Sequence, residues 1–149
     1  MINLVNDIRY AKYITHSGTM HADEVFATAF LQLYKKDIDL FRVSQVNSAD
    51  VLPDVIIYDV GRGKFDHHQE NRRVRENGIP YCSLGLLWDE FGKDYLKQIG
   101  IEYVDEVFTG IDQDFIEGID AIDNGIFPKV EAEYKIRNIA DVIKLFNPS

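Results

Sequence analysis

The stretch DVIIYDV at residues 54–60 decides the fold class of this chain. Its continuous apolar run is typical of a β-strand buried on both faces, as the strands of parallel sheets are. Upstream, KYIT at residues 12–15 and DLFRVS at residues 39–44 predict two further strands. Between them, apolar residues recur at helical spacing over residues 22–34, which predicts an amphipathic helix. This alternation predicts an α/β fold, an open and mostly parallel sheet with helices on both faces.

Three more helical stretches follow the predicted sheet. Residues 83–91 form a predicted helix with Ser83 as its cap, residues 103–122 a long helix or a broken pair, and residues 139–146 a last helix. The chain has no internal repeat, low-complexity tract or linker rich in Gly, Ser and Pro. Because its 149 residues suit one domain, we expect residues 1–149 to form a single domain.

The composition excludes several classes of protein. Hydrophobic residues make up 46% and charged residues 28%, which are ordinary values for a globular domain. A net charge of -9 repels polyanions, so the domain alone is a poor non-specific binder of nucleic acid. The single cysteine, Cys82, excludes an intrachain disulfide and a Cys-rich zinc site. With no membrane-length apolar run and no signal-peptide pattern, we expect a cytoplasmic protein without membrane association.

All four histidines fall in two short motifs that carry carboxylates. HSGTMHADE at residues 16–24 follows the first predicted strand, and DHHQ at residues 66–69 lies a few residues past the buried strand that ends at Asp59. Ligands of open α/β sheets bind beyond the carboxyl ends of the strands. We therefore expect these segments to converge on one edge, together with Asp123 at the end of the long helix.

Imidazole and carboxylate groups together indicate a site for borderline divalent metals. A tetrahedral zinc ion needs about four ligands. The motifs offer six or more, and this surplus favours two ions about 3.5–4 Å apart. Single residues also have structural explanations that involve no metal. Asp59 could cap a turn, Asp120 or Asp123 could be a surface acid, and Glu24 suits a helix dipole.

The motifs together resemble a known family. From about His16 to Phe146, the chain is similar to the melanocyte-proliferating-gene-1 (Myg) family of DHH-like metal-dependent phosphoesterases. The stretches that carry the resemblance are HSGTMHADEVFATAFL, IIYDVG, FDHHQ, GIPYCSLGLLWDEFG and IDAIDNGI. It implies a DHH phosphoesterase-like N-terminal domain, and eukaryotic members are regarded as 3′–5′ RNA exonucleases. The family's second domain is expected to be absent from these 149 residues.

The resemblance also implies roles for individual residues. Asp59 would bridge two ions, which we expect to be Mn²⁺, with Zn²⁺, Co²⁺ or Mg²⁺ as alternatives. Asp120 is a weaker ligand candidate than Asp123. The implied metal ligands are His16, His21, Asp23, Asp59, His67 and Asp123, and the implied catalytic residues are Asp59, Asp66 and His68. Arg72, Arg73 and Arg75 follow the DHH motif as candidate phosphate contacts, although a solvated loop is the slightly favoured explanation for them.

We therefore expect a metal-dependent hydrolase, a phosphodiesterase or exonuclease-type domain that cleaves phosphate esters with metal-activated water. Its expected substrate is a phosphate ester, RNA or a short oligonucleotide among them. A homodimer or a separate second-domain partner could complete the site. Two alternatives stay open: a metal-binding module without turnover, and a hydrolase of a small phosphorylated metabolite or pyrophosphate.

Overall fold

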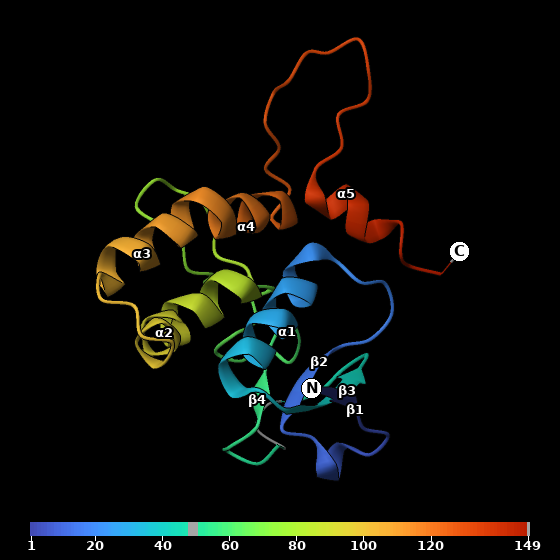
Figure 1. Ribbon diagram of the computed structural model, residues 1–149. Coiled ribbons are helices and arrows are strands. Elements are labelled where there is room, and N and C mark those ends of the chain that lie inside the picture. The colour runs from blue at the N-terminus through green and yellow to red at the C-terminus, as the bar shows by residue number, and fades with distance from the viewer. Residues whose placement is uncertain (48–50, 149) are drawn as a thin grey trace.

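A four-stranded parallel sheet lies beneath a layer of helices (Figure 1). The computed structural model describes residues 1–47 and 51–148. The strands are β1 (Ile2–Leu4), β2 (Tyr13–His16), β3 (Ile38–Val43) and β4 (Ile56–Ile57), in the order β1-β3-β2-β4. Every neighbouring pair is parallel, so the predicted α/β class with a parallel sheet is confirmed.

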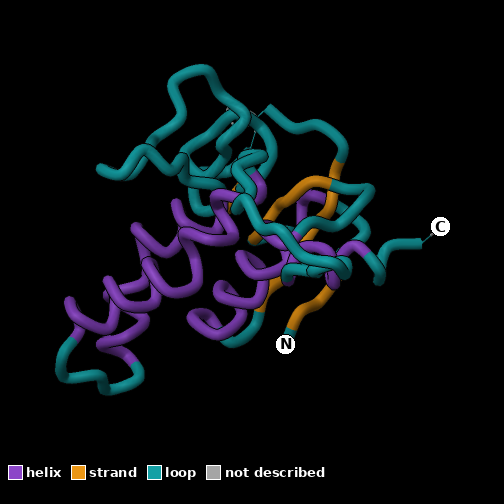
Figure 2. Tube along the Cα trace, turned by 90° about the horizontal axis from the view of Figure 1, so that it is seen from above, coloured by secondary structure: helices purple, strands orange, loops and turns teal. Residues whose placement is uncertain are grey.

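The helices group together at one side in Figure 2, while the long connecting loops lie mainly at the other. They are α1 (Ala22–Lys35), α2 (Ser83–Gln98), α3 (Val104–Ile111), α4 (Glu117–Asp123) and α5 (Ile139–Lys144), with a 3-10 turn η1 (Ile8–Tyr10) and a π-helical turn η3 (Asp112–Ile116). Within the described residues, no helix has both the length and the apolar character needed to span a membrane.

The main hydrophobic core lies between the sheet and the helices. Phe30 of α1 meets Trp88 of α2 edge-on with ring centroids 5.3 Å apart, and Trp88 stacks on Phe108 of α3 at 5.4 Å. The opposite face of the sheet carries a small cluster centred on Ile14 and Ile57, to which no helix contributes a residue. The prediction of helices on both faces is therefore wrong for the described residues.

The connections explain this one-sided layer. Among the described residues of the connections between strands, only the crossover from β2 to β3 contains a long helix, α1. The connection from β1 to β2 is a single 3-10 turn, and residues 44–55 before β4 include Pro53, which suits no helix interior.

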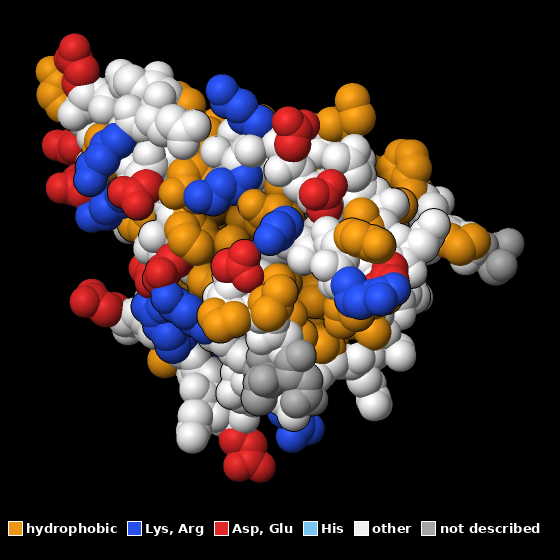
Figure 3. Space-filling view, turned by 90° about the horizontal axis from the view of Figure 1, so that it is seen from below, with side chains coloured by type: hydrophobic (Ala, Val, Ile, Leu, Met, Phe, Trp, Pro, Cys, Tyr) orange, Lys and Arg blue, Asp and Glu red, His pale blue; other side chains and the backbone are white. Residues whose placement is uncertain are grey.

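Figure 3 shows basic and acidic side chains interspersed on the face seen from below, without one large field of either sign.

Several predicted boundaries differ from the observed ones. The helix predicted to end at Phe91 continues to Gln98, because Gly92 packs against the ring of Trp88 and Leu96 is buried. The helix predicted over residues 103–122 is α3 and α4, joined by the π-helical turn. The strand predicted over residues 54–60 pairs regularly only at β4, followed by an isolated bridge between Tyr58 and Phe65.

The C-terminal segment returns to the loop that precedes α1. The Asn147 side-chain amide donates to the carbonyl of Met20 at 2.8 Å, and the Met20 N–H donates to Asn147 Oδ1 at 2.6 Å. Ala140 of α5 is buried in the main core. These two hydrogen bonds hold the loop beside His21 at a fixed distance from α5.

Candidate metal centre

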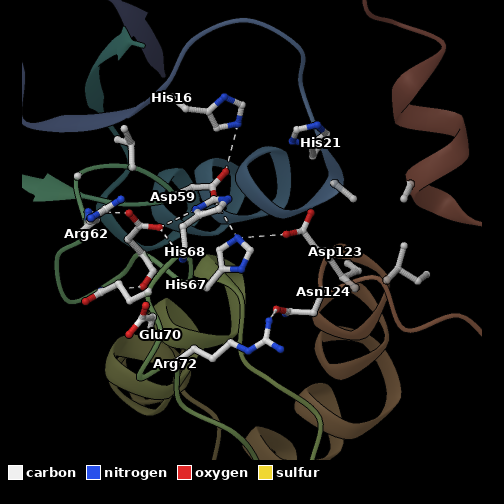
Figure 4. Close-up of a pocket in the computed structure, with 18 of the residues that line it drawn as sticks. His16, His21, Asp59, Arg62, His67, His68, Glu70, Arg72, Asp123 and Asn124 are labelled. Carbon is white, nitrogen blue, oxygen red and sulfur yellow. Dashed lines mark hydrogen bonds and ion pairs between the residues drawn. The ribbon is translucent and has the colours of Figure 1, made fainter. Parts of the chain in front are cut away.

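A cavity of about 1040 Å³ lies where β2 and β4 end. It brings together the start of α1, the loop that carries the DHH sequence and the end of α4 (Figure 4). Among the residues that line it are His16, His21, Asp59, Asp66, His67, His68, Arg72 and Asp123. The structure thus places on one cavity the segments that the sequence analysis expected to converge.

Asp59 lies at the centre of this cluster. Its Oδ2 is 3.1 Å from His16 Nε2, and its Oδ1 is 3.1 Å from His67 Nε2 (Figure 4). Asp59 has φ 56, a left-handed conformation that is costly for a residue other than glycine. Its N–H donates to the carbonyl of Phe65 at 3.0 Å, so a backbone contact holds the strained residue in place. The Asp59 carboxylate therefore faces a different histidine with each of its two oxygens.

The charges of Asp59, His16 and His67 depend on one another. Burial by itself would raise the pKa of Asp59, but hydrogen bonds from His16 and His67 outweigh it and lower that pKa to about 2. Hydrogen bonds to Asp59 and Glu24 raise the pKa of His16 to about 10. Burial opposes the charge on His67, yet Asp59 and nearby carboxylates raise its pKa to about 9. Any metal that binds these histidines must therefore displace protons.

One group of potential ligands comes from the first motif. His16, His21 and Glu24 have ligand atoms that all lie within 4.8 Å of one another. Glu24 Oε1 is 3.0 Å from His16 Nε2 and accepts the His21 N–H at 2.7 Å. Glu24 Oε2 is buried without a hydrogen-bond partner among the described residues. An unpartnered buried carboxylate oxygen beside two imidazoles fits a cation ligand.

Sequence reasoning did not include Glu24 in the ligand set. Its place in the first turn of α1 had a sufficient explanation in the helix dipole. The available signal was its spacing, since Glu24 is three residues after His21 and so shares a helix face with it.

A second group faces the other oxygen of Asp59. His67 Nε2 lies 3.2 Å from Asp123 Oδ2 and 3.8 Å from Asp23 Oδ2. Figure 4 shows Asp123 extending from the end of α4 toward His67. Burial, together with the charges of Asp59 and Asp123, raises the pKa of Asp23 to about 8. Three carboxylates around one imidazole make a cluster that a divalent cation would neutralise.

Asp23 also caps α2 from outside that helix. Its Oδ1 accepts the Leu84 N–H at 2.7 Å and its Oδ2 accepts the Ser83 N–H at 3.1 Å. The residue before the helix is Cys82, whose side chain makes no cap, so the prediction that Ser83 is the cap is wrong. Asp23 therefore links the ligand cluster to the start of a core helix.

Asp66 faces His68 rather than the centre of the cluster. Its Oδ1 accepts His68 Nδ1 at 2.8 Å and the His68 N–H at 3.0 Å, and its Oδ2 accepts the Arg62 N–H at 2.6 Å. Asp66 is buried, whereas the His68 side chain is 60% exposed. The Asp66 carboxylate orients the His68 ring, so that His68 Nε2 faces away from Asp66.

Asp120 and Arg75 lie in the protein interior. Arg75 Nη1 is 2.7 Å from Asp120 Oδ2, and Arg75 Nη2 is 2.6 Å from Asp112 Oδ1. The guanidinium also covers the ring of Tyr81, 4.0 Å from its centroid. Burial raises the pKa of Asp120 to about 6, although Cys82 and Arg75 oppose the shift. Because Arg75 is buried against two carboxylates, the prediction that it contacts phosphate is wrong.

The other two predicted arginines differ in their access to the cavity. Arg72 lines it and donates from Nη1 to Asn124 Oδ1 at 2.9 Å (Figure 4). Arg73 pairs with Asp89 at 2.9 Å and is not among the residues of this cavity. Arg62, which sequence reasoning did not single out, also lines the cavity.

A parallel α/β sheet with histidines and carboxylates gathered at its strand ends defines a class: α/β proteins with a candidate centre for divalent metal ions. The chain belongs to the MYG1 exonuclease family, whose model matches residues 12–149 and is described as an uncharacterised protein family (UPF0160). The predicted family membership is thereby confirmed.

Relatives of this chain occur across eukaryotes. It is 33% identical to the MYG1 exonuclease of Homo sapiens, in a match that covers 80% of this chain and 37% of the human protein. It is 32% identical to a MYG1 protein of Caenorhabditis elegans over 130 residues, covering 75% of this chain and 38% of that protein. The chain thus spans less than half the length of these relatives. No solved structure matches it.

Proposed function

We propose that residues 1–149 form a DHH-like metal-binding domain that hydrolyses phosphodiesters with the help of two divalent metal ions. The observation that carries this proposal is the position of Asp59, whose two oxygens each lie 3.1 Å from a different histidine. A carboxylate shared in this way suits a bridge between two ions. The human relative is named an exonuclease, which supports an oligonucleotide as the substrate.

The residues present fit such a pair of ions. His16, His21 and Glu24 would hold one ion with Asp59, and Asp23, His67 and Asp123 would hold the other with the second oxygen of Asp59. The buried, unpartnered Glu24 Oε2 supports the fit of the first group. Mixed imidazole and carboxylate donors suit borderline divalent metals such as Mn²⁺, Co²⁺ or Zn²⁺. The resemblance to DHH phosphoesterases favours Mn²⁺ among them, with Mg²⁺ as a further alternative. Bound ions would lower the pKa of a water and neutralise charge on the phosphoryl oxygens.

Protein groups around the cluster would do the rest of the chemistry. His68 presents its Nε2 away from Asp66, and it would give a proton to the leaving oxygen from that atom. Asp66 would act on the reaction only through His68, as a positioning residue. Arg72 would contact a phosphoryl oxygen from the cavity wall.

A substrate panel tests this function. The purified chain, supplied with manganese, is assayed against a short RNA, bis(p-nitrophenyl) phosphate and pyrophosphate. We expect both phosphodiesters to be cleaved and Asp59→Asn to abolish cleavage. Asp54→Asn is the matched control, because Asp54 makes only an exposed ion pair with Lys12.

Each other result selects a different function. If nothing is cleaved although metal binds, the chain is a metal-binding module, or it requires a second copy or a separate partner chain. Cleavage of pyrophosphate without cleavage of RNA would instead identify a hydrolase of small phosphorylated molecules. An Asp59→Asn variant as active as the wild type would refute the proposed centre.

A further inference from the structure

A second cavity, of about 360 Å³, lies beside the candidate metal centre. Arg62, His67 and Arg72 line both cavities, so the two share a wall. Lys64 and Arg73 line only the second cavity, as do Asn71 and Tyr81. The second cavity therefore adjoins the first and lies within reach of a molecule bound there.

Positive charge dominates this second cavity. Four basic side chains line it, Arg62, Lys64, Arg72 and Arg73, whereas the acidic residues that line it number one, Asp66. Both oxygens of Asp66 already accept hydrogen bonds, from His68 and from the Arg62 N–H. The chain as a whole carries a net charge of -9, so this local excess of basic groups is unusual for it.

The four cations have few competing partners. Lys64 pairs with Glu90 at 2.6 Å and Arg73 with Asp89 at 2.9 Å, but these Lys64 and Arg73 side chains are more than half exposed. Such surface pairs contribute little and exchange readily for a better anion. Within the described ranges, the Arg62 guanidinium has no carboxylate partner.

Arg73 is held toward the cavity by an aromatic ring. Its guanidinium lies 4.9 Å from the centroid of Tyr81, whose ring also contacts the buried Arg75. A cation stacked on a ring directs its N–H groups outward at its edge, where they match the oxygens of a phosphate. Arg73 Nη1 donates to Asp89 in an exposed pair, which a phosphate would replace.

We infer that the second cavity binds a further phosphate group of the substrate, next to the phosphodiester at the metal centre. The preferred substrate is then an oligonucleotide, or a nucleotide with an additional terminal phosphate, rather than a molecule with one phosphate. This inference rests on the proposed function for the identity of its substrate. The binding of an anion by the cavity stands on the four cations alone.

Phosphate binding is tested first, without catalysis. The ¹⁵N-labelled chain, in the presence of a chelator, is titrated with inorganic phosphate while the amide signals of Gly63 and Asn71 are followed. We expect these signals to shift, and the Lys64→Gln/Arg73→Gln variant to bind about tenfold more weakly, since two charge-assisted contacts are lost. The matched control is Arg9→Gln/Lys93→Gln, because Arg9 and Lys93 also form exposed ion pairs.

The substrate preference is tested with dinucleotides that share one phosphodiester. One carries no terminal phosphate, one a 5′-phosphate and one a 3′-phosphate. We expect one phosphorylated dinucleotide to have a KM about tenfold below that of the unphosphorylated one. In Lys64→Gln/Arg73→Gln this ratio falls toward one, and in the control variant it stays. A ratio taken within each variant cancels any general effect on activity.

The two tests separate two kinds of failure. If no dinucleotide is cleaved, the proposed function is refuted, while the phosphate titration still decides whether the cavity binds anions. If Gly63 and Asn71 do not respond, or if both double variants weaken binding equally, the anion cavity is refuted. Equal KM values for all three dinucleotides would refute the role of the cavity in substrate choice.

Discussion

Replacing Gly85 with alanine is expected to destabilise the protein sharply, although alanine is the better helix former. A methyl carbon at Gly85 would lie 2.0 Å from Asp120 Oδ2 and 2.9 Å from Tyr81 Cδ1. Asp120 cannot withdraw without loss, because its Oδ2 is 2.7 Å from Arg75 Nη1 and its Oδ1 is 2.5 Å from Cys82 Sγ. The added methyl group must therefore displace a fully buried carboxylate from its ion pair.

The loss of stability can be estimated from the contacts that the methyl group disturbs. Overfilling a packed interior costs about 1–3 kcal/mol, and breaking a buried ion pair costs about 3–5 kcal/mol. Part of the pair can persist through a small shift, and alanine returns about 0.5–1 kcal/mol of helix propensity. We therefore expect Gly85→Ala to lower the free energy of unfolding by about 3 kcal/mol.

Gly118→Ala is the matched control, since nothing lies within 4 Å of its added methyl group in helix α4. This variant should gain about 0.5–1 kcal/mol. Urea unfolding of both variants, followed by circular dichroism with a chelator present, measures the difference. Equal stability of Gly85→Ala and Gly118→Ala would show that Asp120 is free to move, and the rigid network argued above would be wrong.

Three further predictions concern the candidate metal centre. Manganese, cobalt or zinc, added after chelator treatment, should raise the melting temperature, with about 2.7 kcal/mol of stabilisation at a hundredfold excess over Kd; an unchanged melting curve would contradict metal binding. Asp59→Asn should lose at least one metal ion per chain, whereas Asp120→Asn, whose side chain lies away from the cavity, should keep the wild-type metal content. Elemental analysis of both variants measures this content, and the reverse pattern would refute Asp59 as the bridging ligand. In the metal-free protein, the free energy of unfolding should fall as the pH rises from about 6.5 through about 9 and 10. The folded state raises the pKa values of His67 and His16, so their ion pairs are intact below this window and are lost above it. Melting temperatures measured with a chelator across that range check the trend, and Asp59→Asn should flatten it.

Local pattern was a sufficient guide to the fold wherever one element buries a regular face. The helical spacing of residues 22–34 corresponds closely to α1, and the parallel sheet follows from the alternation of strands and helices. The strand β1 was not predicted, since all three of its residues are exposed and no buried side chain marks it. It pairs with β3 through its backbone and through one exposed side-chain hydrogen bond, from Asn3 Nδ2 to Asp39 Oδ1 at 3.1 Å. The end of α2 was misplaced because Gly92 reads as a helix stop unless its packing against Trp88 is known.

The candidate site was predictable to the extent that its residues stand beside strand ends. His16 ends β2, Asp59 comes shortly after β4, and His67 lies in the loop that follows. Parallel topology brings such strand ends to one edge of the sheet. The spacing from His21 was an available signal for Glu24, whereas the partners of Arg75 were not predictable. Whether an arginine after the DHH sequence faces solvent or two carboxylates depends on how η3 and α4 pack, because they carry Asp112 and Asp120, and no local pattern records that packing.

The two hydrogen bonds between Met20 and Asn147 have a consequence for the order in which the site is assembled during synthesis. The loop that holds His21 leaves the ribosome before Asn147, the residue that fixes this loop, which is 127 positions further along the chain. Closing so long a loop is slow compared with forming α1. In the nascent chain, Glu24 can hold the His21 N–H as soon as α1 forms, but the loop at Met20 stays unfixed until α5 has docked. The cluster is therefore expected to gain its full affinity for metal only as a late folding event.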